Sequence, residues 1–247
     1  MPSMPNLNED WLVQNHGPLE RLEDGLLTVA GDIRMPLGNF PRRMTVVALP
    51  GGRTLIWSAI PLREPEMREI EALGAPAFLV VPGVAHRLDV RAWKKRYPDA
   101  KVVCAPGAAQ AVREAVAVDA TANVFEDTTV RFEPAPGVED KEAVMIVRRD
   151  GRSSLVLNDI LANVRHPNGL GATIMARLMG FGVDRPRLPW LGKWLFVKDR
   201  AALAEGFRSW AAEPNLCRII VSHGDVIDTN PRQILQRIAK ELSPARG

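Results

Sequence analysis

The spacing of apolar residues changes along the first half of the chain, from the two-residue repeat of strands to the longer repeat of amphipathic helices. Two β-rich runs flank residues 50–53 and predict a hairpin across a Gly-Gly turn. A charged helix follows, with Pro65 in its first turn and Gly74 after its last residue. Strand, helix and strand then alternate, which is typical of a βαβ unit. The expected elements are strands at 25–30, 44–49, 54–58, 77–81 and 101–105 and helices at 64–73 and 88–97.

The second half of the chain opens with a run of short strands rather than with crossovers. Asp150-Gly151 joins two of them as a hairpin. The terminal helix is expected to start at Asn230-Pro231, with Asn230 as N-cap. The other expected elements are helices at 108–118 and 198–211 and strands at 122–125, 129–132, 143–147, 154–157 and 218–221. Two halves that each combine a β-meander with helices predict facing sheets covered on both outer sides.

Composition places the chain among ordinary globular proteins. Its 247 residues, 46% of them hydrophobic, can bury a full core, and no linker is visible, so we expect a single domain over 1–247 with an N-terminal extension at 1–24. The net charge is only +3, and no run of five like charges occurs. The basic clusters at 94–96 and 148–152 are therefore interpreted as solvated surface rather than as a nucleic-acid site.

The sequence also predicts the compartment. No apolar segment reaches the roughly 18 residues that a membrane helix needs, and no signal-peptide pattern opens the chain. Cys104 and Cys217 lie far apart in apolar runs, which favours two free thiols. We therefore expect a cytoplasmic protein that binds neither membranes nor nucleic acid.

The chemistry-bearing residues follow the ends of buried strands. His86 comes five residues after the strand at 77–81, Asp159 follows Leu155-Val156-Leu157, and His223 follows the strand at 218–221. Groups at these positions line the site of layered α/β folds, because the core beneath them is rigid. The nucleotide-binding glycine motifs, the serine-hydrolase elbow and Cys-x-x-Cys are all absent from the sequence. His16 and His166 lie in polar loops and are assigned to the surface.

These features together resemble a known superfamily. The chain has Lys-Arg-Tyr-Pro-Asp-Ala-Lys at 95–101, Leu-Val-Leu-Asn-Asp at 155–159 and Ile-Ile-Val-Ser-His-Gly-Asp at 219–225. With the loop Pro82-x-x-x-His86, this succession resembles the metallo-β-lactamase superfamily over residues 25–240. It is similar to a poorly characterised branch whose members have a Met-Thr-Val-Val-type opening hairpin, found here at 44–47. The resemblance implies an α/β fold, a four-layer αββα sandwich of two mixed sheets with helices on both outer faces.

The metal-binding motif of that superfamily is incomplete in this chain. Catalytic members carry His-x-His-x-Asp-His after the first buried strand, and His86 corresponds to its last histidine. Gly83 and Ala85 offer no metal ligand. The separate histidine expected about twenty residues before the later aspartate also has no counterpart, and Glu142 is the nearest polar candidate. We therefore expect a reduced site and no two-metal mechanism.

The resemblance implies that the remaining ligands serve one metal position. They would be His86, Asp159 and His223, which can hold a single Zn²⁺ or Fe²⁺ ion. Such an ion would lower the pKa of a bound water toward about 7 and supply hydroxide for hydrolysis. Asp225 or Asp89 would orient a ligand histidine from behind. Alternatively, each of these residues caps a turn or makes an ordinary hydrogen bond, and no metal binds.

A Met- and Trp-rich insertion at 166–197 lies where the superfamily places substrate-shaping segments. Within it we assign Met179, Trp190 and Trp194 to the substrate side, and the helical spacing of residues 174, 178 and 181 predicts one apolar face. The segment is core, a lid, an apolar wall or a homo-oligomer surface at 168–196.

Two hypotheses follow. One is a metallo-β-lactamase-like hydrolase with a small-molecule substrate and at most one metal. The other is a non-catalytic, metal-free member of the fold that binds a small ligand or a protein.

Overall fold

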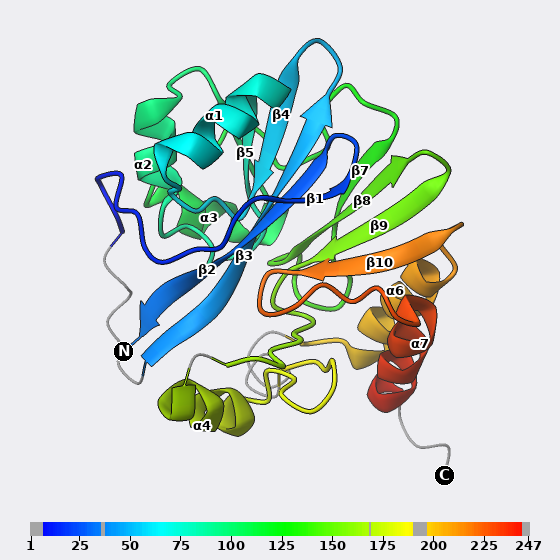
Figure 1. Ribbon diagram of the computed structural model, residues 1–247. Helices are drawn as coiled ribbons and strands as arrows, with labels where there is room; N and C mark the ends of the chain where they lie inside the picture. Colours follow the sequence, from blue (N-terminus) through cyan, green and yellow to red (C-terminus); the bar gives the residue numbers. More distant parts are fainter. Residues whose placement is uncertain (1–6, 36–37, 168, 190–196, 244–247) are drawn as a thin grey trace. The chain divides into compact units, whose positions relative to one another are not determined.

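The structure, a computed structural model, describes residues 7–35, 38–167, 169–189 and 197–243 and divides the chain into two compact units (Figure 1). Unit 1 comprises residues 1–32 and 43–127, and unit 2 comprises residues 33–42 and 128–247. Among the described residues, no helix is long and apolar enough to cross a membrane.

A mixed sheet of six strands, which neighbour one another in chain order, forms the centre of unit 1. The hairpin β3/β4 is antiparallel, whereas β4, β5 and β6 run parallel, so the residues that follow these three strands emerge at one edge. The end of β2 from residue 33 and the start of β3 up to residue 42 belong to unit 2. The strands are β1 (Glu20–Glu23), β2 (Leu26–Met35), β3 (Gly38–Leu49), β4 (Arg53–Trp57), β5 (Ala75–Val81) and β6 (Lys101–Cys104).

The helices of unit 1 cover one face of this sheet (Figure 1). The amphipathic helix α1 buries Met67 and Ile70, and the next helix buries Trp93 against the core. The apolar face of each crossover helix therefore packs on the strands that it connects. The helices are α1 (Glu64–Leu73), α2 (Val90–Arg96), the 3₁₀ turn η1 (Pro106–Ala108) and α3 (Ala109–Arg113).

A mixed sheet of four strands in the order β10-β9-β8-β7 forms the centre of unit 2. The β8/β9 hairpin turns at Asp150 and Gly151, both at positive φ. Strand β10 pairs parallel to β9, with Val221 opposite Leu157, so the two carboxyl ends coincide. The strands are β7 (Val130–Pro134), β8 (Ala143–Arg149), β9 (Arg152–Leu157) and β10 (Leu216–Val221).

Two helices, α6 (Arg200–Ala211) and α7 (Pro231–Leu242), pack on this sheet through a fully apolar core. Leu203, Phe207 and Trp210 of α6 share that core with residues of α7, β8, β9 and β10. A shorter helix, α4 (Gly169–Met179), lies apart from this pair (Figure 1). Since one face of α6 and one face of α7 are buried in this core, the opposite faces of these two helices point to solvent.

Most predicted elements are confirmed, and the failures are local. The hairpin across residues 50–53, the helix α1 and the start of α7 at Pro231 agree with prediction. The strand predicted at 122–125 is wrong, and the helix predicted at 108–118 ends already at Arg113. Strand β1 was not predicted, because its sequence Glu-Arg-Leu-Glu lacks β-branched residues. Asn230 does precede α7, but at positive φ and without a capping side-chain hydrogen bond.

Candidate functional site

The parallel pairing of β9 and β10 brings two predicted ligands together in unit 2. Asp159 and His223 each lie two residues beyond the paired strand ends. His223 Nε2 is 3.1 Å from Asp159 Oδ1, and the two side chains are 14% and 18% exposed. The register of two neighbouring strands therefore creates an imidazole-carboxylate pair that solvent can still reach.

The other ring nitrogen of His223 is also engaged. Its Nδ1 lies 2.8 Å from the carbonyl oxygen of Pro41 in β3, which can only accept a hydrogen bond. Two acceptors thus face one imidazole. This arrangement favours a proton or a metal cation at each of the two ring nitrogens. Burial lowers the pKa of His223, but the hydrogen bond and the charge of Asp159 outweigh it, so that this pKa is raised above its ordinary value.

Aromatic rings surround the same imidazole. The rings of Phe40 and Phe181 lie 5.2 Å and 5.6 Å from the His223 ring, and the two phenylalanines contact each other edge to face at 4.6 Å. Phe40 belongs to an apolar cluster with Val164 and Ala176. These contacts restrict the ring of His223 to one orientation.

Glu142, the nearest polar candidate for the missing histidine of the superfamily, lies next to Asp159 in the structure. Its Oε2 accepts hydrogen bonds from Asn158 Nδ2 at 2.6 Å and from the backbone N–H of Asp159 at 3.4 Å. Burial, followed by the charge of Asp159, raises the pKa of Glu142 well above its usual range. Among the described residues, Asn158 Oδ1 is a buried acceptor without a partner. A buried carboxyl group whose ionisation is disfavoured therefore lies, with an amide, beside the imidazole-carboxylate pair.

His86 belongs to unit 1, where it follows β5. Its Nδ1 lies 2.7 Å from the hydroxyl of Ser58, which is the first residue after the neighbouring strand β4. Ser58 has a φ of 56°, a backbone conformation that non-glycine residues rarely adopt. The parallel pairing of β4 and β5 therefore positions a hydroxyl against this histidine.

Two predicted supporting residues have other contacts. The Oδ2 atom of Asp225 lies 2.9 Å from His166 Nδ1, and it is the Pro41 carbonyl that contacts His223 Nδ1. Asp89 is buried and accepts a hydrogen bond of 2.6 Å from Asn8 Nδ2. Their roles in orienting a ligand histidine stay predictions.

The two remaining histidines differ in exposure. The side chain of His166 is 85% exposed, as predicted. The surface assignment of His16 is wrong, because this residue is buried and accepts the backbone N–H of Arg63 at Nε2. Its other ring nitrogen faces the carbonyl oxygen of Gly17, so His16 has a structural role.

The Met- and Trp-rich segment is described only in part. Met179 packs against the cluster of Phe40, Val164 and Ala176, while Ile174 and Leu178 of α4 are 58% and 65% exposed. Trp190 and Trp194 lie outside the described residues. Packing of Met179 on a cluster that contains Phe40 links this segment to the surroundings of His223.

Sequence reasoning missed three groups that position the candidate residues. The Pro41 carbonyl could not be found from side-chain patterns, because every residue carries a carbonyl. Phe40 and Ser58 lie more than twenty residues from the histidines they contact. The sequence did contain one signal, the glycine that follows His223. At φ 104°, a Cβ at Gly224 would lie 2.1 Å from the Asn163 carbonyl oxygen, so this residue must be glycine.

Comparison with known proteins identifies the fold. No family model and no curated protein matches the sequence. Solved structures do match: the metallo-β-lactamase DIM-1, crystallised after exposure to ceftazidime, superposes with a TM-score of 0.61 at 13% identity, over 94% of this chain and all of that one. FIM-1 from Pseudomonas aeruginosa, in its mono-zinc form, gives 0.58 at 14%, over 96% and 99%. A metallo-β-lactamase from Hirschia baltica gives 0.58 at 14%, over 92% and 99%.

The chain has the metallo-β-lactamase fold. The resemblance inferred from the strand-end residues is thereby confirmed at the level of architecture, an α/β sandwich with two mixed sheets. Identities of 13–14% carry no further conclusion about activity.

Proposed function

We propose that the chain is a hydrolase-like protein of the metallo-β-lactamase fold with a single metal site, held by His86, Asp159 and His223. The observation that carries the proposal is the environment of His223, whose two ring nitrogens face the Pro41 carbonyl and the Asp159 carboxylate. A neutral imidazole has one N–H, so its second nitrogen would confront the carboxylate with a lone pair unless a cation lies at that nitrogen. A divalent ion takes imidazole nitrogens and carboxylate oxygens as ligands, and it can replace a proton at the ring nitrogen that faces the carboxylate.

The surrounding groups fit this donor set. The Pro41 carbonyl accepts a hydrogen bond from Nδ1–H and leaves Nε2 as the ligand nitrogen, the usual support of a metal-binding histidine. The proposal adds His86 as the third ligand, as the resemblance implies. FIM-1, a protein of the same fold, has been crystallised in a mono-zinc form, which supports the hypothesis of a single metal ion in this chain.

Zn²⁺ or Fe²⁺, when bound, would polarise a water molecule or a substrate carbonyl. The residues of the chain supply binding, orientation and proton storage. Asp159 and His223 provide an oxygen and a nitrogen ligand, and Phe40 and Phe181 keep the imidazole in place. Burial and the charge of Asp159 raise the pKa of Glu142, so this carboxyl group can hold a proton beside Asp159. Hydrolysis of a small-molecule substrate is the reaction class that this set supports.

Metal analysis of untagged protein tests the proposal. We expect about one Zn or Fe per chain in the parent, and a loss of most of it in His223→Ala and in His86→Ala, because three-ligand sites rarely survive the loss of one ligand. His166→Ala is the matched control, since it removes an exposed histidine of unit 2 that bonds only Asp225 among the described residues. Unchanged metal content in both ligand variants would reject the site.

The alternative is a metal-free binding module that uses residues 168–196 to take a small ligand or a second protein. It predicts negligible metal in the parent protein, even after incubation with Zn²⁺. Met179 of this segment packs on the Phe40 cluster, a contact that any such module would have to retain. Cytoplasmic location stays part of the proposal, supported by Cys104 and Cys217, which form no disulfide.

A further inference from the structure

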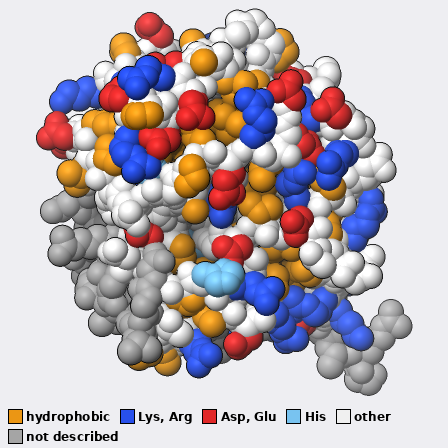
Figure 2. Space-filling model, viewed as in Figure 1, with side chains coloured by type: hydrophobic (Ala, Val, Ile, Leu, Met, Phe, Trp, Pro, Cys, Tyr) orange, Lys and Arg blue, Asp and Glu red, His pale blue; other side chains and the backbone are white. Residues whose placement is uncertain are grey.

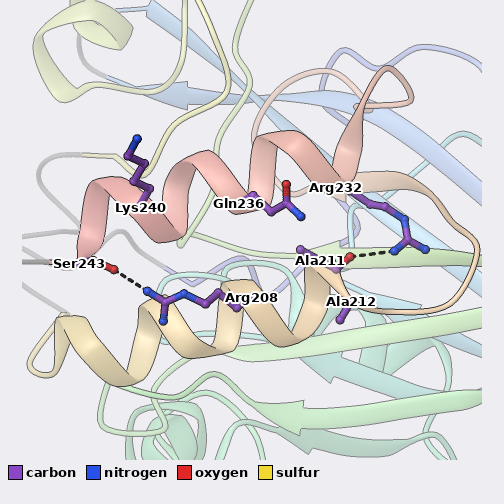
Figure 3. A pocket seen from close by; sticks show the side chains of 7 residues that line it. All are labelled: Arg208, Ala211, Ala212, Arg232, Gln236, Lys240 and Ser243. Carbon is purple, nitrogen blue, oxygen red and sulfur yellow. Dashed lines mark hydrogen bonds between the residues drawn. The ribbon is translucent and has the colours of Figure 1, made fainter.

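A groove with basic lining lies between α6 and α7 of unit 2 (Figure 3). Its volume is about 530 Å³, within the range of small-molecule sites. Among the described residues, the lining combines cations, an amide and a hydroxyl with two alanines, and none of these lining residues carries a carboxylate. Its polar members are Arg208, Arg232, Gln236, Lys240 and Ser243.

The groove opens on the side of the helix pair that faces away from the sheet. Leu235, Ile238 and Leu242 of α7 are buried in the core of unit 2. Gln236 and Lys240 belong to the opposite, exposed face of the same helix. The basic residues are therefore not needed to fill the core, and their arrangement calls for another explanation.

Positive charge is concentrated on this helix pair. The helices α6 and α7 carry five cations against two carboxylates, Glu205 and Glu241, a surplus that equals the net charge of +3 of the whole chain. Figure 2 shows Lys and Arg side chains gathered at the lower right, where Figure 1 places α7. A local surplus of positive charge beside a concave surface attracts anions.

Hydrogen bonds fix the two arginines. Arg232 donates to the carbonyl oxygens of Ala211 and Glu213, at 3.1 Å and 2.7 Å, and these two acceptors are neutral and do not compensate its charge. Arg208 donates to Ser243 Oγ at 2.6 Å and to the exposed carboxylate of Glu205 at 2.9 Å. In Figure 3, Arg208 reaches from α6 toward the end of α7, and Arg232 reaches from α7 toward the end of α6. Both guanidinium groups are therefore in place before any ligand arrives.

We propose that this groove binds a phosphate-bearing small molecule. Guanidinium groups match phosphate oxygens with paired hydrogen bonds, and Gln236 can donate a further one from its amide. Residues 232, 236 and 240 follow at intervals of four, about 6 Å apart along the helix, so the donors span roughly 12 Å. That span suits a ligand with more than one anionic group, and the small side chains of the two lining alanines leave room for such a ligand. None of these residues is a candidate metal ligand.

Calorimetric titration of the full chain with inorganic pyrophosphate tests this proposal. We expect saturable binding by the parent and at least tenfold weaker binding by Arg208→Gln, because a charge-assisted pair of hydrogen bonds is lost. The matched control is Arg200→Gln, which removes the same charge from the same helix outside the groove and should change affinity less than threefold. Arg208→Lys should recover part of the affinity, since it restores the charge without the planar fork.

Three outcomes would overturn the proposal. The first is no saturable binding by the parent protein. The second is equal weakening by Arg200→Gln and Arg208→Gln, which would reduce the effect to overall charge. The third is a loss of binding in Asp159→Asn with none in Arg208→Gln, which would assign pyrophosphate to the candidate metal site instead. Because Arg208 is about half exposed and outside the core, its substitution should leave the thermal transition unchanged.

Discussion

The two candidate histidines, one in each unit, are positioned by different kinds of group. His223 has a carbonyl oxygen at one ring nitrogen and a carboxylate at the other, and neither can donate a hydrogen bond. The Nδ1 atom of His86 faces the hydroxyl of Ser58, which can donate or accept. The environment of His223 therefore dictates where its protons lie, whereas the Ser58 hydroxyl lets His86 adopt either tautomer.

The difference extends to the backbone. The chain after His223 passes so close to the neighbouring loop that the backbone N–H of Asn163 donates to the carbonyl oxygen of His223 at 3.0 Å. His86 instead lies in a run of turns, where its own N–H bonds the carbonyl of Gly83 at 3.2 Å. A histidine fixed by long-range contacts should tolerate fewer substitutions around it than one fixed locally.

The largest expected effect is that of Gly224→Ala. The new Cβ would lie 2.1 Å from the Asn163 carbonyl oxygen, at a φ of 104° that alanine rarely adopts. We expect the free energy of unfolding in urea to fall by about 3 kcal/mol or more, because backbone has to move. Bound metal should be lost together with stability.

Gly151→Ala is the matched control for that substitution. Gly151 also lies in unit 2 and has a φ of 72°, but nothing lies within 4 Å of a Cβ built there. Its cost should stay near 1 kcal/mol, the conformational cost alone. Equal destabilisation by the two variants would show that the close approach at Gly224 does not matter.

A second, smaller effect is a pH dependence of stability that depends on the His223 environment. Because the pKa of His223 is raised in the folded protein, its stabilising contribution is complete below its ordinary pKa of about 6.5 and is lost as pH rises through the raised value. The raised pKa of Glu142 acts in the same direction, since ionising this buried group costs free energy. Chelator-treated protein should therefore be more stable in urea at about pH 6 than at about pH 8.

Asp159→Asn should reduce this pH dependence, because the carboxylate that stabilises the imidazolium is gone. Each unit of pKa shift that disappears corresponds to about 1.4 kcal/mol. Glu142→Gln should remove only the second contribution. If the stability difference between the two pH values is the same in Asp159→Asn and in the parent, the pair does not control the charge of His223.

The fold was predictable because its signals are local. Neighbouring residues determine the turn at residues 50–53, the boundaries of α1 and the continuous apolar run of β5. The end of α3 was not predictable in this way: residues 114–118 have helical composition, yet the chain leaves the helix and runs on to pair Ala120 with Val103. A tertiary contact there overrides helix propensity.

The candidate site was predictable only in its outline. Polar residues after buried strands pointed to Asp159 and His223, and the parallel register of β9 and β10 does bring them together. The partners that fix their chemistry were not visible, because Pro41 contributes a backbone carbonyl from a distant strand. Asp225 was a reasonable candidate by proximity in sequence, yet its carboxylate lies against His166. Sequence spacing identifies which residues emerge at an edge but not in which direction they point.

The smallest expected effect is that of Ser58→Ala, which tests the other half of the comparison. Loss of the hydroxyl that lies 2.7 Å from His86 Nδ1 should cost about 1 kcal/mol of stability, the value of one hydrogen bond. Zn²⁺ affinity, measured by competition with a chelator, should fall about tenfold, as is usual when a group behind a ligand histidine is removed. Ser209→Ala, on the exposed side of α6, makes the same change away from any candidate ligand. Weaker Zn²⁺ binding in Ser58→Ala alone would show that a hydroxyl suffices to orient His86, whereas equal affinities would leave the carbonyl and carboxylate at His223 as the groups that determine metal binding.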